Sequence, residues 1–289
     1  MTAINIMKLI INHWASKLCV LLVALAPFTA VQAELSLTQV WQVKDLATPE
    51  SVLYVKQKQN EFLLVSLIDG VPTEADAQGG IAMLALDGTP IDKAWVTGLN
   101  APKGMGIYNN KLYVADINEV VVIDIQLHKV IKKIPIPKSI FLNDVAVSAN
   151  GDVFVSDTRL NHIYRIHGDK PQLYMDNIEA ANGLTVAGKN LIVGAGKQLL
   201  QIDPAKKMTT LASGFAQGVD GVELIAPNEY IISCWPGLVY YVNAKGELQV
   251  LIDSQAEKIN TADIGYNPTQ RRVFVPNFFA NTVTAYQLK

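Results

Sequence analysis

The segment Asn143-Asp-Val-Ala-Val147 begins the stretch of sequence that decides the fold of this chain. A turn at Ala149-Asn-Gly151 follows it, and then come Val153-Phe-Val-Ser156, Ile163-Tyr-Arg-Ile166 and Gln172-Leu-Tyr174. Apolar alternation within these runs and the Asn-Gly pair between them predict four short antiparallel strands. The sequence after residue 33 shows no sustained helical period, so an all-β fold is expected.

Similar openings occur five more times in the chain, at Glu50-Ser-Val-Leu-Tyr, Lys103-Gly-Met-Gly-Ile, Asn182-Gly-Leu-Thr-Val, Asp220-Gly-Val-Glu-Leu and Ala262-Asp-Ile-Gly-Tyr. Successive openings are 53, 40, 39, 38 and 42 residues apart. A period near 40 residues indicates a repeat architecture. Six sheets of four strands around a central channel form a β-propeller, and the sequence therefore predicts a six-bladed one.

The two ends of the chain indicate how the ring closes. The last unit contains only three strand-like segments, Ala262–Tyr266, Arg272–Pro276 and Thr282–Leu288, whereas Leu37–Val43 precedes the first unit without a partner. We expect Leu37–Val43 to join the last sheet and to remove its exposed edge. The polar stretch from Asp69 to Gly80 accounts for the longer first period and is predicted to be a loop.

The N-terminal 33 residues have the pattern of a secretory signal peptide. Lys8 and Lys17 precede an apolar run over residues 18–25, and a small-x-small ending at Ala33 suits cleavage. We predict two parts, residues 1–33 as the signal peptide and residues 34–289 as the propeller, with export to the periplasm or secretion. An anchoring or buried helix is the alternative interpretation of residues 1–33.

Composition limits the classes of partner. The formal charge is −2 at pH 7, so no basic footprint for nucleic acid is expected. No second long apolar stretch follows residue 33, which argues against stable membrane insertion of the mature chain. Cys234 is the single cysteine after residue 33, so no internal disulfide is expected, and a buried unreactive thiol is its default role.

Four of the six openings begin with an oxygen-bearing side chain, namely Glu50, Asn143, Asn182 and Asp220. The opening strand of each unit is predicted to be innermost, so these side chains converge at one mouth of the channel. Two carboxylates and two amide oxygens suit a hard divalent cation such as Ca²⁺. The histidines after residue 33 do not occupy opening positions, and no zinc-binding spacing is present.

A competing interpretation applies to two of these openings. Asn182-Gly183 and Asp220-Gly221 are also typical of hairpin turns, because Asn, Asp and Gly tolerate positive φ. The flanking segments are poor strands, and the phase match with Glu50 and Asn143 favours a site.

These residues resemble the senescence-marker-protein/gluconolactonase family of six-bladed propellers, with diisopropylfluorophosphatase and the paraoxonases as more distant relatives. Pro49-Glu50-Ser-Val looks like the first-blade Glu motif of the family, and Leu142-Asn143-Asp144 looks like its first Asn motif. Ala181-Asn182-Gly183-Leu is similar to the second Asn motif, and Val219-Asp220-Gly221 to the Asp motif. The resemblance covers nearly all of residues 34–289 and implies a divalent cation, commonly calcium, held by Glu50, Asn143, Asn182 and Asp220.

The resemblance also implies an activity, the metal-dependent hydrolysis of a small-molecule lactone or ester. Asp220 is then expected to be both a ligand and the catalytic base or nucleophile. A purely structural calcium ligand is the alternative role for Asp220.

Three further residues are candidates for substrate binding. Lys103 takes the opening position of the second unit, where it can bind an anionic substrate or an oxyanion, although it can equally turn outward or pair with an acid. Asp144 follows a predicted ligand, and strand alternation turns it away from the axis. Asp263 is the remaining candidate in the sixth unit, with a turn-backbone acceptor as the alternative.

The rival function is a non-catalytic propeller that binds a ligand or a protein partner, with a structural metal or none. Leu112-Tyr-Val-Ala-Asp116 and Val153-Phe-Val-Ser-Asp157 look like NHL repeats, whose propellers often only bind, and their aspartates are expected to accept bonds from turn backbone. Trp235, Phe278 and Phe279 follow inner strands and either pack between blades or line a substrate pocket.

Overall fold

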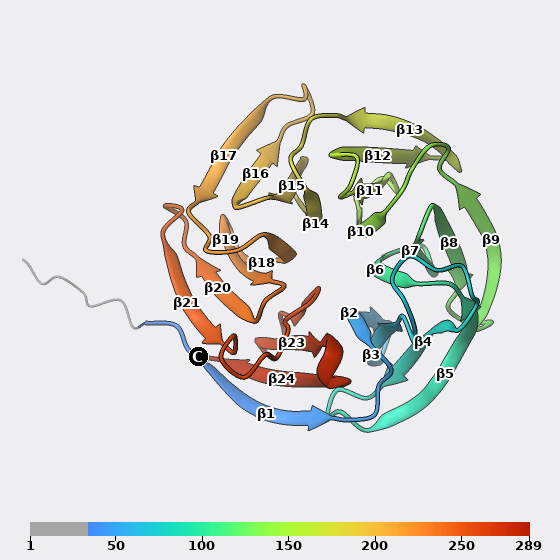
Figure 1. Cartoon of the computed structure of the whole chain (residues 1–289), viewed down its shortest axis with the longest axis horizontal. Helices are drawn as coiled ribbons and strands as arrows, with labels where there is room; N and C mark the ends of the chain where they lie inside the picture. Colours follow the sequence, from blue (N-terminus) through green and yellow to red (C-terminus); the bar gives the residue numbers. More distant parts are fainter. Residues whose placement is uncertain (1–33) are drawn as a thin grey trace, which may run out of the picture. The chain divides into compact units, whose positions relative to one another are not determined.

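The computed structural model describes residues 34–289, and these form a ring of six four-stranded antiparallel sheets (Figure 1). The prediction of an all-β six-bladed propeller is confirmed. The predicted signal peptide, residues 1–33, lies outside the described residues. In the part that is described, no helix is long and apolar enough to cross a membrane.

Blades 1 to 3 follow one another along the chain, each with its strands in sequence order from the axis outward. Blade 1 contains β2 (Pro49–Gln57), β3 (Asn60–Leu67), β4 (Gly79–Leu84) and β5 (Pro90–Leu99). Blade 2 contains β6 (Pro102–Tyr108), β7 (Lys111–Asp116), β8 (Glu119–Asp124) and β9 (Lys129–Pro135). Blade 3 contains β10 (Leu142–Val147), β11 (Val153–Asp157), β12 (His162–His167) and β13 (Lys170–Met175).

Blades 4 to 6 complete the ring. Blade 4 contains β14 (Ala181–Ala187), β15 (Asn190–Ala195), β16 (Gln198–Ile202) and β17 (Met208–Ser213). Blade 5 contains β18 (Val219–Ala226), β19 (Glu229–Cys234), β20 (Leu238–Val242) and β21 (Leu248–Asp253). Blade 6 contains β22 (Gly265–Asn267), β23 (Arg272–Asn277), β24 (Thr282–Leu288) and β1 (Leu37–Val43), with the 3₁₀ helix η1 (Phe278–Ala280) between β23 and β24.

Ring closure occurs as the unpaired ends of the sequence predicted. β1 pairs antiparallel with β24 over its whole length, from Leu37 opposite Leu288 to Val43 opposite Val283. In Figure 1 the blue N-terminal strand lies beside the red C-terminal one. The outer edge of β24 is therefore paired within the chain, and β1 gives blade 6 the fourth, outermost strand that the other blades also have.

The sixth opening differs from its prediction. A strand was expected over Ala262–Tyr266, but β22 spans only Gly265–Asn267. Asp263 instead forms an isolated parallel bridge with Ser51 of blade 1, in which Asp263 N–H donates to Glu50 O at 2.9 Å. The backbone at Asp263 is thus used to join blade 6 to blade 1, and it is not available to extend β22.

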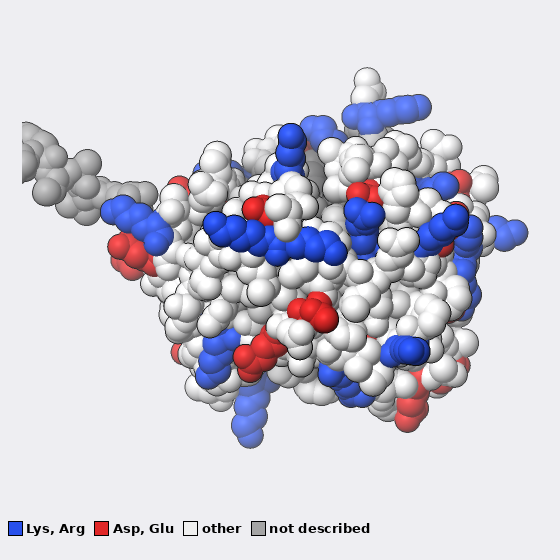
Figure 2. Space-filling model, turned by 90° about the horizontal axis from the view of Figure 1, so that it is seen from above, with Lys and Arg blue, Asp and Glu red and all other residues white. Residues whose placement is uncertain are grey.

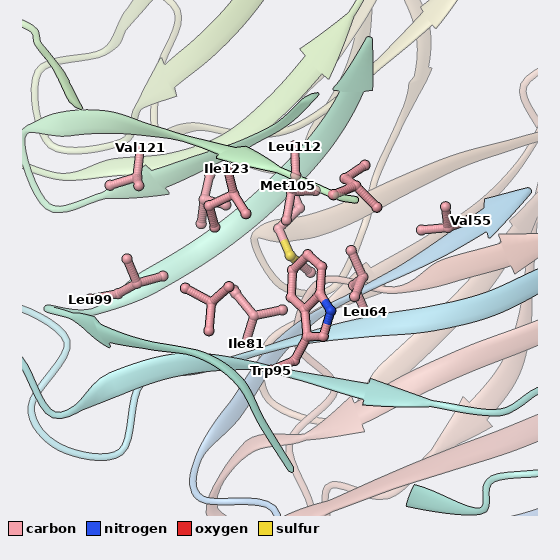
Figure 3. Packing of buried hydrophobic residues seen from close by; sticks show 12 residues of the cluster. Val55, Leu64, Ile81, Trp95, Leu99, Met105, Leu112, Val121 and Ile123 are labelled. Atoms are coloured by element: carbon pink, nitrogen blue, oxygen red, sulfur yellow. The ribbon is translucent and has the colours of Figure 1, made fainter. Parts of the chain in front are cut away.

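The core lies between neighbouring blades, because strand alternation gives each sheet two apolar faces. In β3, Leu64 packs toward blade 2, whereas Leu63 and Val65 pack toward blade 6. Figure 3 shows the cluster between blades 1 and 2, where Trp95 and Met105 fill the space between the two sheets. Six such clusters close the ring, and each buried aliphatic side chain contributes about 1.5–3 kcal/mol.

Each innermost strand of blades 1 to 5 is irregular at its opening. The pairing register shifts between Pro49 and Ser51 in blade 1, and corresponding shifts occur at 102–105, 142–145, 181–184 and 219–222. A β-bulge bends the strand and redirects side chains. Every predicted opening residue of blades 1 to 5 lies within such a bulge, at the beginning of an innermost strand.

A buried serine satisfies the backbone at three of these bulges. The N–H groups of Ser51, Asp144 and Gly221 donate to the hydroxyl oxygens of Ser66, Ser156 and Ser233 at 2.9, 2.9 and 2.7 Å. All three serines are fully buried in the second strand of their blades. A buried N–H without a partner costs about 1–3 kcal/mol, so these hydroxyl groups stabilise the bulged openings.

Charged side chains are distributed over the outside of the ring. Figure 2 shows lysine and arginine interspersed with aspartate and glutamate on the face in view. This mixed pattern agrees with the small net charge of the whole chain and provides no basic surface on that face.

Close approach of the innermost strands gives a first test of this architecture. A Cβ atom at Gly183 would overlap the carbonyl oxygen of Asp220 in the next blade, so we expect Gly183→Ala to lower the unfolding free energy by about 1–3 kcal/mol. Urea unfolding measures this loss. Gly218→Ala is the matched control, because its nearest non-neighbouring atom is 3.9 Å away; equal stability of the two variants would contradict the packing described for the channel.

Candidate functional site

The bulged openings bring five polar side chains to one cavity at the end of the channel where the innermost strands begin. We call it the mouth cavity; its volume is about 240 Å³, and its polar side consists of Glu50, Lys103, Asn143, Asn182 and Asp220. The four predicted metal ligands therefore lie together. The hairpin-turn interpretation of Asn182-Gly183 and Asp220-Gly221 is wrong. The first pair lies within β14 and the second within β18, and none of the four residues has a positive φ.

Glu50 is a buried member of the polar side. The residue is 5% exposed, and among the described residues its Oε2 atom has no hydrogen-bond partner. Burial raises the pKa of Glu50 well above its ordinary value, and the negative charge of Asp220 adds to this, whereas Lys103 opposes it. An unpartnered buried carboxylate oxygen needs a proton or a cation to compensate for lost hydration.

Hydrogen bonds orient the two amides. Asn143 Nδ2 donates to Thr158 Oγ1 at 3.1 Å, and the Thr158 hydroxyl in turn donates to Ala181 O at 2.8 Å. Asn182 Nδ2 donates to Asp220 Oδ1 at 2.9 Å. Since both amide nitrogens are used in this way, the amide oxygens of Asn143 and Asn182 are the atoms left for a ligand.

Lys103 lies in the same cavity and is held by groups of the chain itself. Its ammonium donates to Pro72 O at 3.1 Å and to Ala101 O at 2.9 Å, and it lies 4.6 Å from the centre of the Phe141 ring. Lys103 is 1% exposed, so it does not turn outward, and no acid of residues 34–289 forms a salt bridge with it. Burial lowers the pKa of Lys103 to about 8, while the charge of Glu50 acts in the opposite direction.

Asp144 and Asp263 lie elsewhere, in a second cavity of about 230 Å³ farther along the channel, which Glu223 also lines. Asp144 accepts the N–H groups of Val145 and, in the next blade, Leu184. Asp263 accepts the Ser51 hydroxyl at 2.5 Å. Both carboxylates thus connect neighbouring blades, and neither lines the mouth cavity where substrate binding was expected.

The remaining residues that line the mouth cavity are apolar, and we call them its apolar side: Ile68, Pro72, Phe141, Trp235 and Phe278. Trp235 and Phe278 pack edge to face with ring centres 4.7 Å apart. Phe279 continues this cluster outward, 5.0 Å from Phe278, and is 71% exposed. These aromatic residues were expected either to pack between blades or to line a substrate pocket. Trp235 and Phe278 line the cavity that contains the predicted ligands.

Some residues that shape the site were not predicted. Thr158 orients Asn143, and Ser66, Ser156 and Ser233 support the bulges. The sequences Val65-Ser-Leu, Val155-Ser-Asp and Ile232-Ser-Cys, each with a small polar residue inside an apolar strand, were the available indication.

The two NHL-like aspartates accept backbone N–H groups as expected. Asp116 Oδ1 accepts Ala101 N–H at 2.7 Å, and Asp157 Oδ2 accepts Ile140 N–H at 2.8 Å. Both bonds hold the segment that enters the opening of the same blade.

The donor set fits a hard divalent cation. The polar side offers Glu50 Oε2, the second oxygen of Asp220 and two oriented amide oxygens, all of the type that Ca²⁺ prefers. Among residues 34–289 no group of three or more His, Cys, Asp or Glu side chains is arranged to hold a metal, so the mouth cavity supplies two carboxylates and its other candidate ligands are amide oxygens. The Lys103 ammonium is the one feature that opposes a cation, and the backbone carbonyls of Pro72 and Ala101 hold it.

Comparison with known proteins supports the fold. No family model matches the sequence, and none of the curated proteins matches it significantly. Among solved structures, a streptogramin B lyase is similar with a TM-score of 0.63 at 10% identity, covering 88% of this chain and 98% of the lyase. An inactive variant of virginiamycin B lyase from Staphylococcus aureus with quinupristin gives 0.60 at 12% identity, covering 89% and 100%. At these identities the similarity shows a shared propeller fold, one that includes enzymes.

The buried acids make stability depend on pH in metal-free protein. Burial raises the pKa of Asp144 to about 6 and that of Asp220 to about 7, so the folded state binds more protons than the unfolded state between about pH 4 and about pH 8. The unfolding free energy of chelator-treated protein should therefore fall as pH rises from 5 to 8, by about 1.4 kcal/mol per unit of pKa shift. Denaturant unfolding across this range measures the slope.

Asp220→Asn removes one of these buried acids, so its unfolding free energy should fall less steeply between pH 5 and 8 than that of the wild type. Relative to the wild type, the variant should therefore be more stable at pH 8 than it is at pH 5. Glu257→Gln, at an exposed position in a turn, is the control and should keep the wild-type slope. A wild-type stability that rises from pH 5 to 8 would contradict the arrangement of buried acids.

Proposed function

We propose that this chain is an exported, divalent-cation-dependent hydrolase of lactones or esters, similar to the senescence-marker-protein/gluconolactonase family, with a Ca²⁺-type ion held in the mouth cavity. The observation that carries the proposal is the convergence of Glu50, Asn143, Asn182 and Asp220 on one cavity, with a buried Glu50 oxygen that has no partner among the described residues.

The orientation of the ligands supports this role for the cation. Thr158 and Asp220 accept the amide N–H groups of Asn143 and Asn182, which turns both amide oxygens away from those bonds. A site of two carboxylates and two carbonyl-type oxygens neutralises a divalent charge and leaves coordination positions for water and substrate. The ion would polarise a substrate carbonyl group and acidify a bound water molecule.

Asp220 is the residue we assign to proton transfer. Its Oδ1 atom accepts the Asn182 amide, so Oδ2 would bind the ion with one lone pair and use the other to take a proton from water as the water oxygen bonds to the carbonyl carbon. When the carbon–oxygen bond of the ester breaks, the same proton returns to the departing alkoxide. The products are a carboxylic acid and an alcohol, joined in one molecule if the substrate is a lactone.

Metal binding can be tested directly. Chelator-treated protein titrated with CaCl₂ should bind about one ion and show a higher thermal midpoint, because the ion compensates the buried carboxylates. Isothermal titration calorimetry and a thermal shift assay measure the two effects. Glu50→Gln should lower the affinity at least tenfold, whereas Glu223→Gln in the second cavity should retain it.

If Glu223→Gln lowered the affinity for the metal and Glu50→Gln retained it, the ion would be assigned to the second cavity. Absence of both binding and thermal stabilisation in the wild-type protein would exclude the metal.

Hydrolysis needs a separate test. Asp220→Asn keeps the size of the side chain but removes the proton acceptor, so kcat on any lactone that the wild type hydrolyses should fall at least a hundredfold. A pH-indicator assay over a lactone panel measures the rate, and Glu257→Gln serves as the control. Metal binding without turnover of any panel member would favour the alternative, a binding propeller with a structural ion.

A further inference from the structure

The two sides of the mouth cavity differ in chemistry, and this difference bears on the class of substrate. The polar side is formed by the opening residues and the apolar side by Ile68, Pro72, Phe141, Trp235 and Phe278. A ligand whose reacting carbonyl lies at the polar side must place the rest of its atoms against the apolar side, because the cavity is only about 240 Å³.

The polar side has few donors left for a substrate. Lys103 directs its ammonium to two backbone carbonyls and the Phe141 ring, and both asparagine amide groups donate to neighbouring side chains. Apart from the Trp235 indole N–H, the apolar side has no side-chain donor or acceptor.

With the acceptor oxygens of the polar side occupied by the proposed ion, a polyhydroxylated lactone would lose hydrogen bonds to water on entering this cavity without gaining equivalents. Each hydroxyl buried without a partner weakens binding by about five- to 150-fold. An alkyl substituent would instead strengthen binding by about fourfold for each methylene buried.

Exposed apolar residues continue this side outward. Most exposed large hydrophobic residues lie on the outermost strands, one per blade, and so form no patch. Three other exposed hydrophobic residues are each adjacent in sequence to a residue of the apolar side: Val71 precedes Pro72, Ile140 precedes Phe141, and Phe279 follows Phe278. Phe279 also contacts Trp235, with ring centres 5.9 Å apart.

From this arrangement we infer that the substrate is a lactone or ester with an apolar alkyl or aryl substituent, and that Trp235, Phe278 and Phe279 determine this specificity. The inference rests on the proposed hydrolase function and deepens it. It separates this chain from hydrolases of sugar lactones, whose substrates carry a hydroxyl on nearly every carbon.

Six-membered lactones allow a matched test. We expect kcat/KM to rise about two- to fourfold per methylene from δ-valerolactone through δ-hexalactone to δ-octalactone, and to be at least tenfold lower for D-glucono-1,5-lactone than for δ-octalactone. Phe279→Ala should reduce the gain seen with the longest chain, and Trp235→Ala should reduce it further. Leu127→Ala, at an exposed apolar position in the turn between β8 and β9, should leave the series unchanged.

Binding of the corresponding 6-alkyl piperidin-2-ones, measured by calorimetry, makes the result independent of turnover. If no lactone is hydrolysed but lactam affinity still rises with chain length and falls in Phe279→Ala, the specificity stands and the hydrolase proposal fails. If neither kcat/KM nor lactam affinity depends on chain length, or if D-glucono-1,5-lactone is the better substrate, the inference is overturned. Should Trp235→Ala fail to fold, Phe279→Ala alone decides, since its exposed side chain is not part of the core.

Discussion

Crowding around the channel is the constraint on which the rest of this structure depends. Innermost strands from neighbouring blades approach so closely that Gly183 has no room for a Cβ atom beside the Asp220 carbonyl, and Gly104 has none beside Asp144. Regular strand pairing does not continue to the end of these strands, and a bulge begins each of the first five blades. The bulges turn the second side chain of each of these five strands to the mouth of the channel, so the same packing that closes the ring also assembles the polar side of the mouth cavity.

Support for these openings comes from the second strand of the same blade and the turn that follows it. Ser156 accepts the N–H of Asp144, Asp157 accepts that of Ile140, and Thr158 orients Asn143, so three consecutive residues of β11 and the turn after it position one opening. Thr158 then donates to Ala181 O in blade 4. Because these bonds lie in the core or between blades, we regard the site as rigid, and its geometry is coupled to the packing of blades 3 and 4.

The sequence was sufficient for the fold and for the convergence of Glu50, Asn143, Asn182 and Asp220, because both follow from the period of about 40 residues and from strand alternation. Contacts between residues of different blades could not be predicted from the sequence in this way. The positions of Asp144 and Asp263 follow from bonds to Leu184 and Ser51 in other blades, which no pattern within one repeat encodes. Lys103 was ambiguous for a similar reason, since one of its partners, Pro72, belongs to the loop between β3 and β4, whose path the repeat does not determine.

Electrostatics gives the polar side its chemical character. Glu50 and Asp220 are both buried at the mouth, and burial raises the pKa of each, which means that ionisation there is costly without a compensating charge. Lys103 compensates only in part, because its ammonium bonds to backbone carbonyls and to the Phe141 ring and forms no ion pair with a carboxylate of residues 34–289. Protons and the proposed divalent cation would then compete for the same oxygens. Removing protons as pH rises makes the metal-free site less stable and would make binding of that cation more favourable, so the cost of burying these acids would become the driving force for holding the proposed ion.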